Sequence, residues 1–552
     1  MSRRISNWHW FLDYIIIPSL IIFIIFQRNF MHGFIDYFEE GKELAWINEL
    51  FHGRMLYKDT FTLFGPLNVY LEAFSMLVFG KSLAVLRGYF YFGTIITLII
   101  GYFIGRRLCR FRFFAYAIAF ALIVETYHPF WATRWGGLRF GFGLASILCA
   151  INFFKKEKSL WALLAGIFVA VTFLITMDVG ILSLVAISFT FCFYVAFNFE
   201  KFKTFKLKGI VLFFVGISVI LIPFVFYFVF KSAFLPYVNM LTAIAKYHLR
   251  LCAQGRINLW VSLRPSQVFT FNFKYIFLIL LYIYSIIYLI FSIFKKRLYW
   301  RDYCILCLSI YGMLMYKTAM RVIEGPQFQM ALQPAIILGF IFLEDIFKQI
   351  LILKQHITTK ANLVSFITLI FIFILMACFA IFSEKRFYRD LKEWFWYQRH
   401  KDHMMPAYGA AVPFSYLRLS SLKIDRAKGI IVPLQQAEDI EAVTRYITSI
   451  TYPNEAIFTF PEHGIFNFFA DRPVVGRFPI ASLALINKEY QLELMQSLKE
   501  GKPRYVILGK RLSNLAMAID RKEELLPEIT KFIKEHYVLL RSFHTIDIYS
   551  LK

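Results

Sequence analysis

The chain has 552 residues, of which 59% are hydrophobic, and its mean hydropathy is +0.58. Globular proteins are about 45–50% apolar, so the composition excludes an ordinary soluble protein and predicts a polytopic membrane protein. The formal net charge of +25 does not indicate a nucleic-acid partner, because the basic residues form short clusters between apolar spans rather than one stripe. Such clusters are topology signals.

Apolar runs that could cross a bilayer recur from Trp10 to Phe382, since a hydrocarbon core of about 30 Å needs roughly 20 apolar residues. About eleven spans are expected, over residues 10–27, 83–104, 113–126, 140–154, 161–198 as two helices joined at 177–180, 210–230, 275–294, 302–316, a tenth ending near 347, and 363–383. Basic clusters fall in every second connection, which predicts a cytoplasmic N-terminus and, with an odd count, an outer C-terminus. The first span has no cleavage site and is expected to anchor the chain in the cytoplasmic membrane.

The first external loop, residues 28–82, collects acidic, aromatic and turn residues. Asp36, Glu39 and Glu40 are spaced i, i+3, i+4, so a helix over 34–51 would place the three carboxylates on one face. Like charges on one face repel by a few tenths of a kcal/mol per pair. A solvated acidic surface and a catalytic cluster explain the spacing equally well. Residues 66–79 are expected to form a short re-entrant or interfacial helix that Gly80 ends.

This loop resembles the first external loop of the C-type (GT-C) glycosyltransferases, polytopic enzymes related to protein O-mannosyltransferases and aminoarabinose (ArnT-like) transferases that use polyprenyl-phosphate sugars. The residues that carry the resemblance are Asp36 with Glu39-Glu40-Gly41, Gly53, Tyr57-Lys58-Asp59, Gly65-Pro66-Leu67, Phe79-Gly80 and Arg87. The resemblance implies a carboxylate base in an Asp-Glu-Gly motif. Counted back from Gly53, that motif falls on Glu39-Glu40-Gly41, with Asp36 one turn earlier, so the choice between Asp36 and Glu39 stays open. The register of the motif favours Glu39, but Asp36 is the preferred base, because its shorter side chain can be held more rigidly. The family's basic residue before a Pro-Pro pair is missing, and Lys58 is the substitute candidate.

Several external basic residues are candidates for holding the phosphate of a lipid carrier, because the planar guanidinium fork suits phosphate. They are Arg134 and Arg139 in the turn 125–139, Lys246, Arg250 and Arg256 in the segment 231–274, and Arg321 in the turn 317–327. Interface anchoring or surface solvation explains them equally well. Asp178, which resembles a charged position before glycine in relatives, and Asp59 are expected to support the site without acting as the base.

From Glu384 onward the chain is more polar. Strands are expected at 429–433, 456–460 and 505–508, helices at 439–447 and 526–536, and a closing strand pair at 538–551, which together predict a small α/β domain. The expected division is therefore a transmembrane domain at 1–383 and an extracytoplasmic domain at 384–552. The second domain shows no phosphate loop, catalytic triad or metal-ligand spacing.

The expected function is transfer of a sugar from a polyprenyl-phosphate donor to a glycan, lipid or protein acceptor at the outer face of the membrane. A first-loop carboxylate would take the acceptor's proton, the phosphate would leave toward basic side chains, and one displacement would invert the anomeric centre. No cofactor is predicted, and a metal requirement is left open. The rival is a lipid-linked sugar flippase or transporter, which typically shows internal repeats and polar helices at the membrane midplane.

Overall fold

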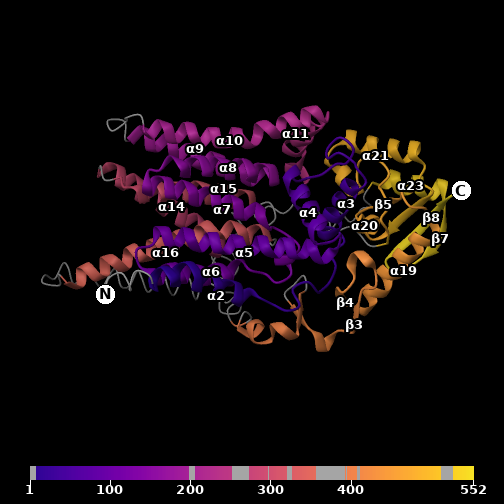
Figure 1. Ribbon diagram of the computed structural model, residues 1–552, viewed down its shortest axis with the longest axis horizontal. Helices are drawn as coiled ribbons and strands as arrows, with labels where there is room; N and C mark the ends of the chain where they lie inside the picture. Colours follow the sequence, from indigo (N-terminus) through magenta and orange to yellow (C-terminus); the bar gives the residue numbers. More distant parts are fainter. Residues whose placement is uncertain are drawn as a thin grey trace.

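A computed structural model describes residues 8–197, 205–251, 273–295, 298–319, 326–355, 392, 395–406, 411–510 and 526–552. Its long helices lie side by side along the longest axis, and the strands of the C-terminal part lie at one end of them (Figure 1). Helices α3 and α4 of the first loop lie between these two parts. The chain therefore places its first loop where the helical bundle meets the C-terminal sheet.

The bundle contains helices at every predicted span that the described residues cover. They are α2 (Ile17–Ile25), α5 (Leu83–Leu108), α6 (Arg112–Thr126), α7 (Leu138–Lys156), α8 (Ser159–Ile175), α9 (Met177–Phe197), α10 (Phe205–Phe230), α14 (Phe273–Phe294), α15 (Trp300–Ala319) and α16 (Pro326–Gln355), with α11 (Phe234–Leu251) after α10. Among described residues, five segments are long and apolar enough to cross a membrane, at 8–25, 83–108, 138–156, 177–197 and 208–230. The predicted span 363–383 lies outside the described residues, so the count of eleven stays a prediction.

Glycines allow close packing of the bundle helices, as is typical of helices in membranes. A Cβ atom on Gly166 of α8 would lie 1.9 Å from the carbonyl oxygen of Phe213 in α10, and one on Gly216 would lie 2.2 Å from that of Leu163. The joint between α8 and α9 falls at Thr176, within one residue of the predicted turn. Gly180 passes so close to Phe173 that a Cβ atom there would lie 2.4 Å from its Cα atom.

The first loop contains α3 (Glu39–Phe51) and α4 (Pro66–Phe79). The predicted helix over 34–51 is wrong at its start, because the Asp36 carboxylate accepts hydrogen bonds from the backbone N–H groups of Phe38 (2.9 Å) and Glu39 (2.8 Å). A side chain used in this way caps a helix instead of continuing it. Helix α4 has the predicted bounds. Proline at its first position suits a helix start, and Gly80 at φ +103° ends it.

The C-terminal part has a four-stranded sheet in the order β5-β6-β8-β7, in which β5 and β6 are parallel and the other pairs antiparallel. Its elements are β1 (Met404–Pro406), β2 (Ala411–Pro413), β3 (Leu419–Ser421), β4 (Ile431–Pro433), α19 (Leu434–Ile450), β5 (Phe458–Phe460), α20 (Ile465–Ala470), α21 (Lys488–Gly501), β6 (Tyr505–Gly509), α23 (Pro527–His536), β7 (Tyr537–Ser542) and β8 (Ile546–Leu551). The predicted strands and helices are present, and α20 and α21 were not predicted.

The first loop shares a hydrophobic core with this C-terminal part. Leu44, Trp46 and Ile47 of α3 are fully buried in the same cluster as Phe466 and Ile480. Polar contacts join the same two segments. The Asn48 amide donates to the carbonyl oxygen of Arg472 (2.9 Å), Glu49 accepts from the N–H of Val474 (3.0 Å), and the N–H of Phe61 donates to the carbonyl oxygen of Arg477 (2.6 Å). The loop therefore packs against the C-terminal part, although a chain division at 383 would assign it to the membrane domain.

The buried Glu49 makes this junction sensitive to pH. Burial raises the pKa of Glu49 to about 7, and the attraction of Arg54, 2.7 Å away, only partly offsets it. The folded state binds this proton more tightly than the unfolded chain, so the resulting stability is fully present below about pH 4.5 and is lost as pH rises to about 7.

We expect Glu49→Gln to remove this loss, because a neutral amide has no charge to bury. The thermal unfolding midpoint of the variant minus that of the native protein, both measured in detergent, should increase as the pH is raised from about 5 to about 8. The exposed Glu438→Gln is the matched control. An unchanged difference between Glu49→Gln and the native protein across this range would contradict the assignment.

Candidate active site

Asp36 and Glu40 cap the start of α3 reciprocally. Asp36 receives the two hydrogen bonds described above, and the N–H of Asp36 donates to Glu40 Oε2 at 2.9 Å. This arrangement is similar to a capping box. Burial and the neighbouring carboxylates of Glu39 and Glu40 raise the pKa of Asp36 to about 6. Asp36 is thus a carboxyl group that titrates near neutral pH but already serves the helix terminus.

Glu40 is fully buried between two arginines. Arg87 of α5 donates to both of its carboxylate oxygens, at 2.6 and 2.9 Å, and Arg134 lies 3.4 Å away. Burial alone would raise the pKa of Glu40, but the two guanidinium groups hold it below its ordinary value. A carboxylate stabilised in its charged form by two cations is a poor proton acceptor. Glu40 is therefore placed to fix the loop.

Both arginines also hold the backbone of the first loop. Arg87 donates to the carbonyl oxygens of Met31 (2.7 Å), Gly33 (3.4 Å) and Phe34 (3.2 Å). Arg134 donates to the carbonyl oxygens of Phe34, at 2.9 and 3.2 Å, and of His32 (3.4 Å) and Phe130 (3.3 Å), and to the Thr133 hydroxyl (2.6 Å). A guanidinium has five N–H donors, and these contacts use all of them in each arginine. Arg134 has no free donor for a phosphate in this structure.

A small cavity adjoins this clamp. It measures about 10 Å³, roughly the space of one water molecule. Its wall includes residues from the first loop, α4 and the start of α7, among them Glu43, Phe64, Asn68, Arg134, Trp135 and Arg139. Carboxylate and guanidinium groups therefore line one cavity, but a substrate would enter it only if the surrounding elements moved apart.

Arg139 is the least satisfied cation of this cavity. Its side chain is buried, its guanidinium carbon lies 4.0 Å from the centroid of the Trp135 ring and 5.0 Å from that of Phe64, and its Nε has no hydrogen-bond partner. Within the described residues it forms no ion pair, although Asp178, Glu39 and Glu43 attract it electrostatically. An unpaired buried charge is costly, so Arg139 is well suited to receive an anion.

The first turn of α3 carries two further charged side chains, Glu39 and Lys42. Glu39 forms an ion pair with Lys42 and is 20% exposed. The Lys42 ammonium lies 5.1 Å from the centroid of the Phe64 ring, the ring that Arg139 also contacts. Two cations therefore gather at Phe64, beside a carboxylate that solvent reaches.

The site also contains a buried carboxyl pair that was not predicted from the sequence. The Asn68 amide donates to Glu72 Oε1 (2.8 Å) and to Glu43 Oε2 (3.4 Å). Burial raises the pKa of Glu43, and burial together with the neighbouring Glu43 carboxylate raises the pKa of Glu72. Glu43 lies four residues after Glu39, and Glu72 is an acid within the apolar helix α4. Both are signals that would have identified them.

The other predicted site residues are placed less centrally. Lys58 and Asp59 lie on an exposed turn, where Asp59 accepts from the N–H of Met55 at 2.9 Å. Asp178 lies in the first turn of α9 and accepts from the Thr176 hydroxyl (2.6 Å) and the N–H of Val179 (2.8 Å). Lys246 is exposed on α11, Arg250 belongs to the same helix, and Arg256 and Arg321 lie outside the described residues. Within the part of the chain that the structure describes, no three His, Cys, Asp or Glu side chains could hold a metal ion.

We expect Arg87→Gln to destabilise the protein by about 3–5 kcal/mol, because it leaves the Glu40 carboxylate buried with one weaker partner. The thermal unfolding midpoint in detergent should fall accordingly. Arg445→Gln, which removes an arginine whose side chain is 76% exposed, should change stability by less than about 0.5 kcal/mol. Equal midpoints for the two variants would show that the clamp does not hold the loop.

Comparison with known proteins identifies the fold. No protein-family model and no curated protein matches the chain. ArnT from Cupriavidus metallidurans, solved bound to undecaprenyl phosphate, is 11% identical over 97% of both chains with a TM-score of 0.52. The archaeal oligosaccharyltransferase AglB from Archaeoglobus fulgidus, solved with an inhibitory peptide and a dolichol-phosphate, is 13% identical over 98% of this chain and 75% of its own, with a TM-score of 0.51. The chain thus has the fold of GT-C membrane glycosyltransferases.

Proposed function

We propose that the protein transfers a sugar from a polyprenyl-phosphate donor to an acceptor hydroxyl or amide at the face of the membrane that bears the first loop. The observation that carries the proposal is the buried, unpaired Arg139 beside the carboxylates of α3. An anion-binding group next to a proton acceptor is what displacement of a phosphate by an acceptor requires. The shared fold with two enzymes solved with polyprenyl phosphates supports the same reaction class.

In the proposed reaction, the acceptor oxygen or nitrogen attacks the anomeric carbon while the bond from that carbon to the phosphate oxygen breaks. The acceptor's proton passes to a carboxylate of α3, and the electron pair of the broken bond leaves on the carrier phosphate. Arg139, with Lys42 as the nearest other cation at Phe64, stabilises the charge that develops on this phosphate. One displacement inverts the anomeric centre, and no separate acid is needed because phosphate is a good leaving group.

Glu39 is the base that we favour among the three predicted acids. Glu40 is held in its charged form by Arg87 and Arg134, and Asp36 is occupied as the helix cap. Glu39 is partly exposed, so an acceptor can reach it, and it lies within electrostatic range of Arg139. The register of the family motif also falls on Glu39. Asp36, with a pKa near 6, is the alternative base.

The residues predicted to contact the polyprenyl-phosphate donor rest on different observations. Arg139 is supported by its missing partner, whereas Arg134 is engaged by the loop and is proposed to position it. Lys58 and Lys246 are exposed and would contact a donor only at the edge of the site. Arg250, Arg256 and Arg321 remain candidate contacts with the lipid-linked phosphate, and Asp59 and Asp178 remain supporting residues.

We expect Glu39→Gln to reduce transfer by about 10²–10⁴-fold, because an amide keeps the shape of the side chain but cannot accept a proton. Asp36→Asn should reduce it by less than about ten-fold, since asparagine also caps helices well. The assay follows release of polyprenyl phosphate by the purified protein with a polyprenyl-phosphate sugar and an acceptor, and unfolding midpoints serve as the folding control. A larger loss in Asp36→Asn would make Asp36 the base, and full activity of both variants would remove both from the mechanism.

A further inference from the structure

A second, larger cavity lies at the opposite end of the bundle. It has a volume of about 400 Å³ and lies where α5 and α7 end and α15 begins. Helix α5 starts beside the first loop at Leu83 and ends at Leu108. At 1.5 Å per residue, its 26 residues span about 39 Å. This cavity is therefore separate from the candidate active site, on the side that the basic clusters predict to be cytoplasmic.

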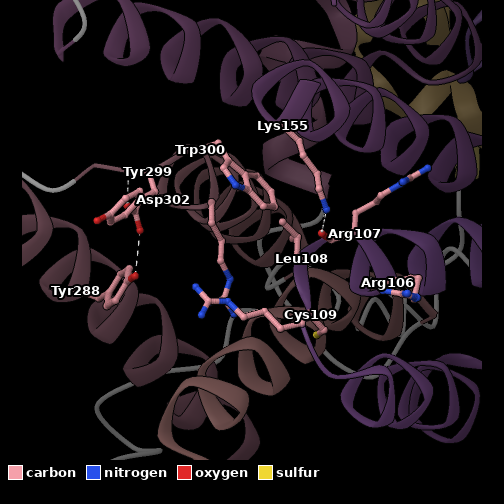
Figure 2. A pocket seen from close by; sticks show the side chains of 11 residues that line it. Arg106, Arg107, Leu108, Cys109, Lys155, Tyr288, Tyr299, Trp300 and Asp302 are labelled. Atoms are coloured by element: carbon pink, nitrogen blue, oxygen red, sulfur yellow. Dashed lines mark hydrogen bonds between the residues drawn. The ribbon is translucent and has the colours of Figure 1, made fainter. Parts of the chain in front are cut away.

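Basic side chains dominate the wall of this cavity. Two of its cations are neutralised, since Arg106 pairs with Asp13 (2.8 Å) and Arg301 pairs with acids of α16. Arg107, Arg110 and Lys155 form no ion pair within the described residues. The Lys155 ammonium donates to the carbonyl oxygen of Arg107 at 3.1 Å, and Figure 2 shows its side chain extending toward Arg107 beside the Trp300 ring. Three uncompensated cations at one cavity repel each other, and an anion would relieve that repulsion.

The acid in the cavity wall does not supply this anion. Asp302 is buried and accepts from the Tyr288 hydroxyl (3.0 Å) and the N–H of Tyr299 (2.7 Å), the first of which is drawn in Figure 2. Arg301 adds an unused donor, because its side chain is buried and its Nε has no hydrogen-bond partner. The wall thus offers donors and positive charge without a matching acceptor.

The shape and the aromatic lining indicate more than a bare anion. A volume of about 400 Å³ lies within the range of small-molecule sites and exceeds what one phosphate group needs. The Trp300 ring, 4.8 Å from the Lys155 ammonium, and the rings of Tyr288 and Tyr299 provide an amphipathic wall of the kind found at membrane interfaces. Basic clusters that only set topology do not require such an aromatic wall.

We propose that this cavity, between the ends of α5, α7 and α15, binds a phosphate ester, with Arg107, Arg110 and Lys155 holding the phosphate and Trp300 contacting the attached group. Guanidinium forks and an ammonium are the groups that proteins use for phosphate. The ester comes either from an anionic phospholipid of the adjoining leaflet or from a soluble phosphate compound. The proposal does not depend on the reaction at the first loop.

The test uses the full chain in nanodiscs and two probes, one for each source. Inorganic pyrophosphate is titrated calorimetrically into discs of phosphatidylcholine, and phosphatidylglycerol retained from mixed discs is counted by native mass spectrometry. The variant is Arg107→Gln with Lys155→Gln. The matched control, Lys158→Gln with Lys208→Gln, removes two exposed cations that do not line the cavity.

We expect the cavity variant to bind one probe about ten-fold or more weakly than the native protein, because two of the three free cations are removed. The control variant should change the affinity for that probe by less than about two-fold. The probe affected identifies the source. The single variant Arg110→Gln, at an exposed position, should weaken the same probe by about three-fold and provides the test if the double variant does not fold. The proposal would be overturned if neither probe binds. It would also be overturned if each probe binds the native protein and the cavity variants with equal affinity.

Discussion

The buried ion cluster of Glu40 with Arg87 and Arg134 is the constraint on which the rest of the site depends. Arg87 comes from α5 and uses its remaining donors on backbone carbonyl oxygens of the first loop. Arg134 comes from the turn before α7 and donates both to backbone carbonyl oxygens of that loop and to Phe130 and Thr133 of its own turn. Removing one partner from such a cluster leaves a charge uncompensated, so the three side chains hold one arrangement. Because successive residues on a helix point about 100° apart, fixing Glu40 also fixes the direction of Glu39. The orientation of α3 relative to Arg139 follows from this clamp.

The same loop is held on its other side by the C-terminal part. Trp46 is fully buried in the shared core, the N–H of Phe61 donates to the carbonyl oxygen of Arg477, and the N–H of Val474 donates to the Glu49 carboxylate. The loop thus acts as an element common to the bundle and the sheet. A carboxylate carried on a helix that is fixed from two sides loses little freedom when a substrate binds, which is the condition for effective catalysis by a positioned group.

The sequence predicts elements well where one local signal decides them. Hydropathy located the helices of the bundle, and the proline and glycine at the ends of α4 set its bounds. The start of α3 was misplaced because aspartate at a helix cap and aspartate inside an amphipathic helix leave the same spacing, and only the hydrogen bonds of Asp36 separate them. Arg134 was expected to be a phosphate ligand, but its five donors are engaged by groups of the loop and its own turn, which no residue pattern reveals. Glu43 and Glu72 form a pair through tertiary contact, although each alone carried a signal in its spacing or its apolar surroundings.

The central claim is that Arg139 binds the phosphate of a polyprenyl carrier, whereas a different residue, the Glu39 carboxylate, accepts the proton. The most direct measurement is the dissociation constant of a polyprenyl phosphate for the purified protein and for its Arg139→Gln and Glu39→Gln variants. The account predicts that Arg139→Gln weakens binding by about ten-fold or more, in line with the loss of a charge-assisted contact, and that Glu39→Gln leaves binding unchanged or tighter. Equal affinity of the native protein and Arg139→Gln would contradict it.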